Sequence, residues 1–286
     1  MININPFPFQ IGISEFTTRP WTFEQDIANY AKLGVDMIEV CEEKLDPMRY
    51  REQMTMIAEH GVTISAVQPL VRTFGSSQMQ LEPRILNERV SRLRCSIKRL
   101  SPFAIGCPFI VNTGAPQQGN VDAMVKITVR ELRELAGFAA DHGVTLALEP
   151  LNASSMNSES AIWTIAQAME IIDAVNRDNV GICLDLWNIW QNAHLEEEIH
   201  RAAGQIFALQ VSDWRTPQSA SDRLIPGEGI MPLGQLLHTV EKTGYSGACT
   251  VEIFSQGVPD SLYATDLDEV IRRSIKGLTG AWFEIH

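Results

Sequence analysis

One pattern recurs along the chain and limits the folds open to it: a stretch with helical periodicity, a small or polar stop, and a short β-rich apolar run. There are eight such runs: IGIS at 11–14, VDMIEV at 35–40, VTISAV at 62–67, PFIVN at 108–112, VTLALE at 144–149, VGICLD at 180–185, IFALQV at 206–211 and ACTVEI at 248–253. Strands that alternate with helices pair in parallel through right-handed crossovers. Because the runs are nearly all apolar, we expect a sheet covered on both faces.

Helical periodicity fills most segments between these runs. In 125–140, Val125, Leu132 and Leu135 share one face, whereas Lys126 and Arg130 lie elsewhere. Similar segments lie near 23–33, 47–60, 84–103, 159–175, 232–243 and 267–279. Capping residues or prolines open several of them: Thr22, Asp46–Pro47, Ser158 and Pro232.

Glycines mark where several of these helices end. A glycine free to adopt the left-handed conformation follows four periodic segments, at Gly34, Gly61, Gly143 and Gly244. His60 and His142 directly precede two of these glycines, so we expect them to serve helix C-termini rather than catalysis. The basic run from Arg84 to Arg99 is interpreted as the solvated face of a helix.

The chain of 286 residues shows no shift in composition and no linker that would divide it. Eight βα units therefore predict a single (β/α)₈ TIM barrel of the α/β class over residues 1–286. Residues 1–10 form an N-terminal extension in this interpretation, and residues 212–230 form a long active-site loop after the seventh strand. An open doubly wound sheet would need a GxGxxG turn after an early strand, which the sequence lacks.

Charge and cysteine content narrow the class of partner. The chain has 23 basic and 35 acidic residues, a formal charge of −12, which disfavours nucleic acid and anionic membranes. No apolar stretch approaches the about 18 residues of a membrane helix. Five cysteines without CxxC spacing indicate buried free thiols. We therefore expect a cytoplasmic protein with a small-molecule ligand; a homo-oligomer is compatible with the sequence.

Acidic side chains follow three of the apolar runs. Glu149, Asp185 and Glu252 end the sequences LALE, ICLD and CTVE. In a barrel the strand ends meet at one mouth, so these carboxylates would repel one another unless a divalent metal or a shared proton intervened. The alternative for each acid alone is a residue that faces solvent or caps the next helix. Glu15, Glu39, Gln68, Asn112 and Gln210 also lie at or near strand ends.

Four motifs in order resemble the xylose-isomerase-like superfamily of sugar isomerases and epimerases, above all its inosose-isomerase-like and sugar-phosphate-isomerase-like members. The motifs are ALEPLN at 147–152, VNRDNVGICLD at 175–185, DR-x-x-PG-x-G at 222–229 and VEIF at 251–254. The resemblance implies a (β/α)₈ barrel with one divalent ion held by Glu, Asp, His and Glu from strands five to eight. It also implies that the two glutamates move a proton next to a carbonyl.

Carried over by position, the implied ligands are Glu149, Asp185 and Glu252, but the third ligand departs from the pattern. Gln210 stands where the family usually has histidine, and Asn188 stands where another histidine is common. If the amide oxygen of Gln210 binds the ion, the all-oxygen set favours Mn²⁺ or Mg²⁺ over Zn²⁺. If Gln210 only fills the space, the chain is a binding module or a metal-independent enzyme.

A second group of residues is expected to contact substrate. Arg223 corresponds to a family arginine near the metal, and the alternative is a surface arginine paired with Asp222. Trp187, with Trp190 and Trp214, is interpreted either as an apolar wall for a sugar or as ordinary core. The expected substrate-binding set is Arg223, Asn188, Asn112, Gln68, Trp187 and Asp213.

The resulting prediction is a metal-dependent isomerase or epimerase of a keto-sugar or inosose that works through an enediolate, with Glu149 and Glu252 as the catalytic pair. Two alternatives stay open on the same residues. One is a dehydratase or lyase of a keto-sugar or dehydroshikimate-like acid. The other is a non-catalytic carbohydrate-binding barrel with a degenerate metal site. The superfamily's DNA-repair branch is disfavoured because its zinc centre needs several strand-end histidines.

Overall fold

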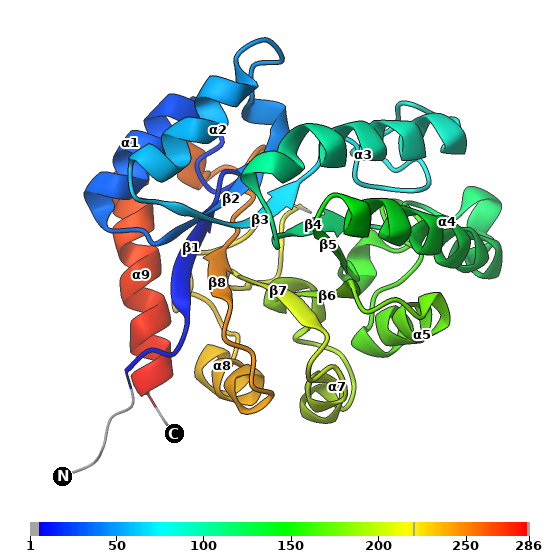
Figure 1. The fold of residues 1–286 in the computed structure, drawn as a ribbon. Helices are drawn as coiled ribbons and strands as arrows, with labels where there is room; N and C mark the ends of the chain where they lie inside the picture. Colours follow the sequence, from blue (N-terminus) through cyan, green and yellow to red (C-terminus); the bar gives the residue numbers. More distant parts are fainter. Residues whose placement is uncertain (1–5, 220, 285–286) are drawn as a thin grey trace.

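Eight parallel strands close into a barrel in which each strand pairs with the next one in sequence and β8 returns to β1. This is seen in a computed structural model that describes residues 6–219 and 221–284. The helices lie outside the ring of strands (Figure 1). The predicted (β/α)₈ barrel is confirmed. Part of the predicted N-terminal extension, residues 1–5, lies outside the described residues, as does position 220 of the predicted long loop.

All eight predicted strands are present, and their ends differ from the predicted ones by at most two residues. The strands are β1 Gln10–Ser14, β2 Met37–Cys41, β3 Thr63–Gln68, β4 Pro108–Val111, β5 Thr145–Leu148, β6 Val180–Asp185, β7 Ile206–Val211 and β8 Ala248–Val251. Their registers place the carboxyl ends of all eight strands at one mouth of the barrel.

The predicted helices are also present. They are α1 Phe23–Leu33, α2 Tyr50–Glu59, α3 Leu86–Leu100, α4 Val121–Asp141, α5 Ile165–Val175, α8 Leu233–Lys242 and α9 Leu267–Phe283. Two short helices between β6 and β7, α6 Leu186–Ile189 and α7 Leu195–Arg201, were not predicted because neither is long enough to show a period. Ser158 is not a helix cap: Thr164 caps α5 by accepting from Gln167 N–H, and 159–163 belong to the preceding loop.

Most helix ends behave as the sequence predicts, but Asp46–Pro47 does not open α2, whose N-cap is Arg49. Gly34 ends α1 at φ +72°, and Gly61, Gly143 and Gly244 also have positive φ. The rings of His60 and His142 lie 2.9 and 2.8 Å from the carbonyl oxygens four residues earlier, so both histidines serve helix ends. The basic run is only partly a solvated face, because Arg89 on α3 is fully buried.

Mostly small side chains, with Ile110 as the exception, fill the inside of the barrel, while larger ones pack between sheet and helices. The inner cluster consists of Ala66, Ile110, Ala147, Cys183 and Ala208. All five cysteines are free thiols, as predicted, but only Cys41, Cys183 and Cys249 are buried: Cys95 is exposed and Cys107 is half-buried. Next to this inner cluster, toward the carboxyl ends of the strands, lies a layer of buried polar side chains that forms the floor of a pocket.

Candidate active site

The structure brings the three strand-end acids together. Glu149 follows β5, Asp185 ends β6 and Glu252 follows β8, and one oxygen from each lies within 4.8 Å of the others. All three side chains are buried. Carboxylates this close repel one another unless protons, hydrogen-bond donors or a cation lie between them.

Arg223 supplies one cation to this cluster. Its guanidinium lies 2.8 Å from Asp185 Oδ2 and 2.9 Å from Glu252 Oε2, and it stacks over the ring of Trp187. The alternative of a surface pair with Asp222 is wrong, because Asp222 pairs with Arg215 instead. Arg223 is therefore part of the site, held between acids and aromatic rings.

Two asparagines hold Glu149. The Asn188 amide donates to Glu149 Oε1 at 3.0 Å and to Asp185 Oδ2 at 2.7 Å. The Asn112 amide donates to Glu149 Oε2 at 2.9 Å. Both asparagines are buried at strand or helix ends, so their donors are fixed in place. Asn112 and Asn188, which the sequence predicts as substrate-binding residues, thus contact the acidic cluster itself.

Gln210 points its amide nitrogen at the acids. Nε2 donates to both oxygens of Glu39, at 3.0 and 2.8 Å, and to Glu252 Oε1 at 3.1 Å, while Oε1 accepts from the thiol of Cys183. Gln68 Nε2 likewise bridges Glu39 and Glu252, at 3.3 Å to each. The predicted ligand atom, the Gln210 amide oxygen, therefore faces away from the acids, because two adjacent carboxylates attract N–H groups and repel an oxygen.

Glu39 is the acid that the predicted site set left out. It is fully buried, and the amides of Gln68 and Gln210 tie it to Glu252. Its sequence signal was a glutamate near the end of the run VDMIEV, at a position facing the barrel interior.

Burial raises the pKa of every acid in the cluster. Desolvation, followed by the charge of Asp185, raises the pKa of Glu149 to about 7. Desolvation holds the pKa of Glu252 well above its ordinary value against the opposing charge of Arg223. The pKa values of Glu39 and Asp185 are also raised by burial. The cluster therefore favours forms that carry protons or bind a cation.

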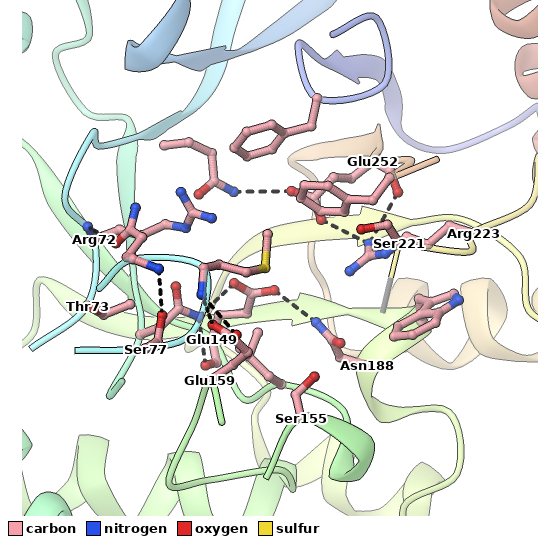
Figure 2. Close-up of a pocket in the computed structure, with 18 residues that line it drawn as sticks. Arg72, Thr73, Ser77, Glu149, Ser155, Glu159, Asn188, Ser221, Arg223 and Glu252 are labelled. Carbon is pink, nitrogen blue, oxygen red and sulfur yellow. Dashed lines mark hydrogen bonds and ion pairs between the residues drawn. The ribbon is translucent and has the colours of Figure 1, made fainter. Parts of the chain in front are cut away.

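A pocket lies over the cluster (Figure 2). Both predicted catalytic acids, Glu149 and Glu252, line this pocket. Five of the six predicted substrate-binding residues line it as well: Gln68, Asn112, Trp187, Asn188 and Arg223. Eleven further lining residues were not in the predicted set, among them Phe16, Arg72, Glu159 and Phe254.

Asp213 and two tryptophans lie elsewhere. The carboxylate of Asp213 accepts backbone N–H groups of Gly227, Met231 and Trp214, so it holds the long loop together rather than lining the pocket. Trp190 and Trp214 pack edge-to-face against each other, with ring centroids 5.2 Å apart. Of the three tryptophans, only Trp187 lines the pocket.

Acids from several strands that converge under one pocket at the carboxyl ends of a (β/α)₈ barrel are typical of TIM-barrel enzymes. The family model described as xylose isomerase-like TIM barrel matches residues 27–279, and the chain belongs to this family.

The relatives include named isomerases and epimerases. An inosose isomerase of Halalkalibacterium halodurans is 30% identical over 158 residues, covering 53% of this chain and 55% of that protein, so the chain matches about half the length of that relative. A D-psicose 3-epimerase of Enterocloster bolteae is 24% identical over 255 residues, covering 84% and 80%. The crystal structure of the IOLI protein with a bound zinc atom superposes with a TM-score of 0.79 at 23% identity, covering 96% and 98%.

Within 6–219 and 221–284, no helix is both long and apolar enough to cross a membrane.

Proposed function

We propose that the chain is a metal-dependent isomerase or epimerase of a keto-sugar or cyclitol ketone. The observation that carries this proposal is the convergence of Glu149 and Glu252 with Asp185, within 4.8 Å, under a pocket of polar and aromatic residues. Two carboxylates on one substrate pocket suit the removal of a proton next to a carbonyl and its return. The names of the relatives, inosose isomerase and D-psicose 3-epimerase, support this reaction class.

The donor set fits a hard divalent cation. Each oxygen of Glu149, Asp185 and Glu252 accepts a hydrogen bond, yet a carboxylate oxygen has two lone pairs, which leaves capacity for an ion at Glu149 above all. Three carboxylates suit Mn²⁺ or Mg²⁺ better than Zn²⁺. Gln210 would become a fourth ligand only if its side-chain amide rotated so that Oε1 faced the acids. A bound ion would polarise a substrate carbonyl and stabilise an enediolate.

The chain's own residues orient the acids. Asn112 and Asn188 fix Glu149, and Gln68, Gln210 and Arg223 fix Glu252, so the two carboxylates approach the pocket from different strands. One of the two takes the proton and the other returns it. Trp187 borders the pocket but is buried in the core, and the Arg223 guanidinium lies over its ring, so its ring supports Arg223.

The test is incubation with ketoses and inososes in D₂O with Mn²⁺, followed by mass spectrometry and stereoisomer analysis. The proposal predicts deuterium next to the carbonyl together with new stereoisomers. Glu149→Gln should lower the rate by about 100-fold or more, whereas the exposed Glu134→Gln should not. Products lighter by one water would instead identify a dehydratase or lyase. No exchange with any member of the panel would contradict the proposed chemistry.

A second candidate is a barrel that binds a sugar without metal. The position of Arg223 favours it, because this guanidinium already neutralises Asp185 and Glu252. The two candidates differ in whether the acids bind an ion at all. A cytoplasmic location and homo-oligomerisation stay predictions from the sequence.

A further inference from the structure

Aromatic rings hold two arginines against the pocket. Arg72 lies over the ring of Phe16 at 5.3 Å, and Phe16 packs on Phe254 with ring centroids 4.8 Å apart. Arg223 lies over Phe254 at 4.9 Å. All four residues line the pocket, and Figure 2 shows Arg72 and Arg223 on different sides of it. Stacking on a ring face favours a fixed position for each guanidinium.

The two arginines differ in what they bind. Arg223 is buried and forms ion pairs with Asp185 and Glu252. The half-buried Arg72 guanidinium forms no hydrogen bond or ion pair with any residue of 6–219 or 221–284. Arg72 therefore keeps its donors free inside a pocket whose floor is acidic.

The backbone around Arg72 is well fixed. Arg72 N–H donates to Gln80 Oε1 at 3.2 Å, and Asn112 N–H donates to the Arg72 carbonyl at 2.8 Å. Glu159, a buried acid on the same pocket, does not pair with Arg72, because its two oxygens accept the backbone N–H of Met79 at 3.0 and 3.2 Å. The backbone of Arg72 is thus fixed. Its charge lowers the pKa of Glu149 from a distance, but its guanidinium forms no ion pair with a described acid and keeps its donors for a ligand.

We propose that Arg72 is a specificity residue that binds a carboxylate of the substrate, so that the enzyme acts on a keto acid of the sugar or cyclitol class. This inference rests on the proposed function. The planar fork of a guanidinium matches a carboxylate through two parallel hydrogen bonds. Among the pocket residues described, the other cation, Arg223, is already engaged, so a single free guanidinium fits a monoanion better than a phosphate.

Such a contact would also fix the orientation in which the substrate binds in the pocket. A carboxylate held at Arg72 leaves the keto end of the molecule to face Glu149 and Glu252. The acidic floor would repel the same carboxylate, so the reversed orientation is disfavoured.

The test is calorimetric binding of three ligands with one carbon skeleton: D-fructose, D-fructuronate, with a carboxylate in place of the terminal alcohol, and D-fructose 6-phosphate. We expect the wild-type protein to bind fructuronate about tenfold or more tightly than fructose, the order that one charge-assisted contact gives. Arg72→Gln should bring this ratio close to one. The matched control Arg84→Gln, an exposed arginine of the same loop that is paired with Glu82, should keep it.

Several outcomes overturn the inference: a wild-type ratio near one, a preference that survives in Arg72→Gln, tightest binding of the phosphate, or no binding in the whole series. Failure of the proposed function has a different signature. In that case fructuronate still binds in preference to fructose and still depends on Arg72, but the bound ketose takes up no deuterium from D₂O.

Discussion

Gln210 donates its side-chain amide to both oxygens of Glu39, at 3.0 and 2.8 Å. The same nitrogen reaches Glu252, so Gln210, at the position where the resemblance implies a histidine, links two buried acids. An imidazole at this position would offer a lone pair to an ion, whereas the amide, as it is turned here, offers N–H groups. The orientation of the Gln210 amide therefore distinguishes two kinds of site: a metal centre, which needs its oxygen, and a network of protonated acids, which needs its N–H groups.

Gln210→His tests this separation. An imidazole ligand beside three carboxylates should strengthen metal binding by about tenfold or more and shift the preference toward Zn²⁺. Calorimetric titration with Mn²⁺ and Zn²⁺ measures both effects. The matched variant Gln210→Leu, which has no ligand atom, should bind no more tightly than the wild type. Unchanged affinity in Gln210→His would show that position 210 lies outside any ion site.

Arg223→Met should destabilise the fold. Its removal leaves Asp185 and Glu252 buried without their cation, and breaking a buried ion pair from one side destabilises a protein by about 3–5 kcal/mol. Urea unfolding gives the value. If the acids also bind an ion, saturating Mn²⁺ should raise the stability of the variant more than that of the wild type. A variant as stable as the wild type without metal would contradict this account of Arg223.

Arg89→Met should loosen one wall of the pocket. The buried guanidinium donates to the carbonyls of Thr73, Gln80 and Pro83, and so anchors the segment that contains Arg72. Unpaired buried carbonyls destabilise by about 1–3 kcal/mol each, so we expect a loss of at least about 2 kcal/mol in urea unfolding.

Arg92→Met is the control for this variant, because Arg92 is exposed on the same helix and, within 6–219 and 221–284, pairs only with Glu88. A surface pair of this kind contributes about 0–1 kcal/mol. Equal losses in the two variants would refute the anchoring role of Arg89.

Glu15→Gln tests a buried acid outside the pocket. Burial, and then the charge of Asp26, raises the pKa of Glu15 well above its ordinary value of 4.5. The folded state therefore holds this proton more tightly than the unfolded chain, and wild-type stability falls as pH rises above 4.5. Between the pKa values of Glu15 in the unfolded and folded states, this acid lowers the free energy of unfolding by up to about 1.4 kcal/mol per pH unit.

The neutral amide of Glu15→Gln lacks this dependence. Its stability relative to the wild type should therefore increase as pH rises from about 4.5 to about 8. Urea unfolding across this range measures the difference. A difference that stays constant with pH would mean that the Glu15 carboxyl titrates alike in the folded and unfolded states.

Most of the fold was predictable because it rests on local patterns. Each of the eight strands coincides with an apolar run, and glycines at Gly34 and Gly143 end helices where the sequence places them. The helix α7 was not predictable, because its seven residues include the consecutive acids Glu196, Glu197 and Glu198 and show no clear apolar face. Short elements depend on tertiary packing more than on period.

The site was predictable in its residues and less so in its contacts. Strand ends identified Glu149, Asp185 and Glu252, because barrel topology brings such positions to one mouth. The turn of the Gln210 amide and the inclusion of Glu39 depend on side-chain packing across strands far apart in sequence. Asp213 lies close to Gln210 in sequence, yet its carboxylate is taken up by the backbone of its own loop.

Titration of the purified protein with Mn²⁺, monitored by calorimetry, tests the central claim most directly. If Glu149, Asp185 and Glu252 form an ion site, the wild type binds one ion, and Asp185→Asn weakens the binding by about tenfold or more. Exposed Glu134→Gln should leave it unchanged. A wild-type protein that binds no ion, or an Asp185→Asn variant that binds as tightly as the wild type, would contradict the claim.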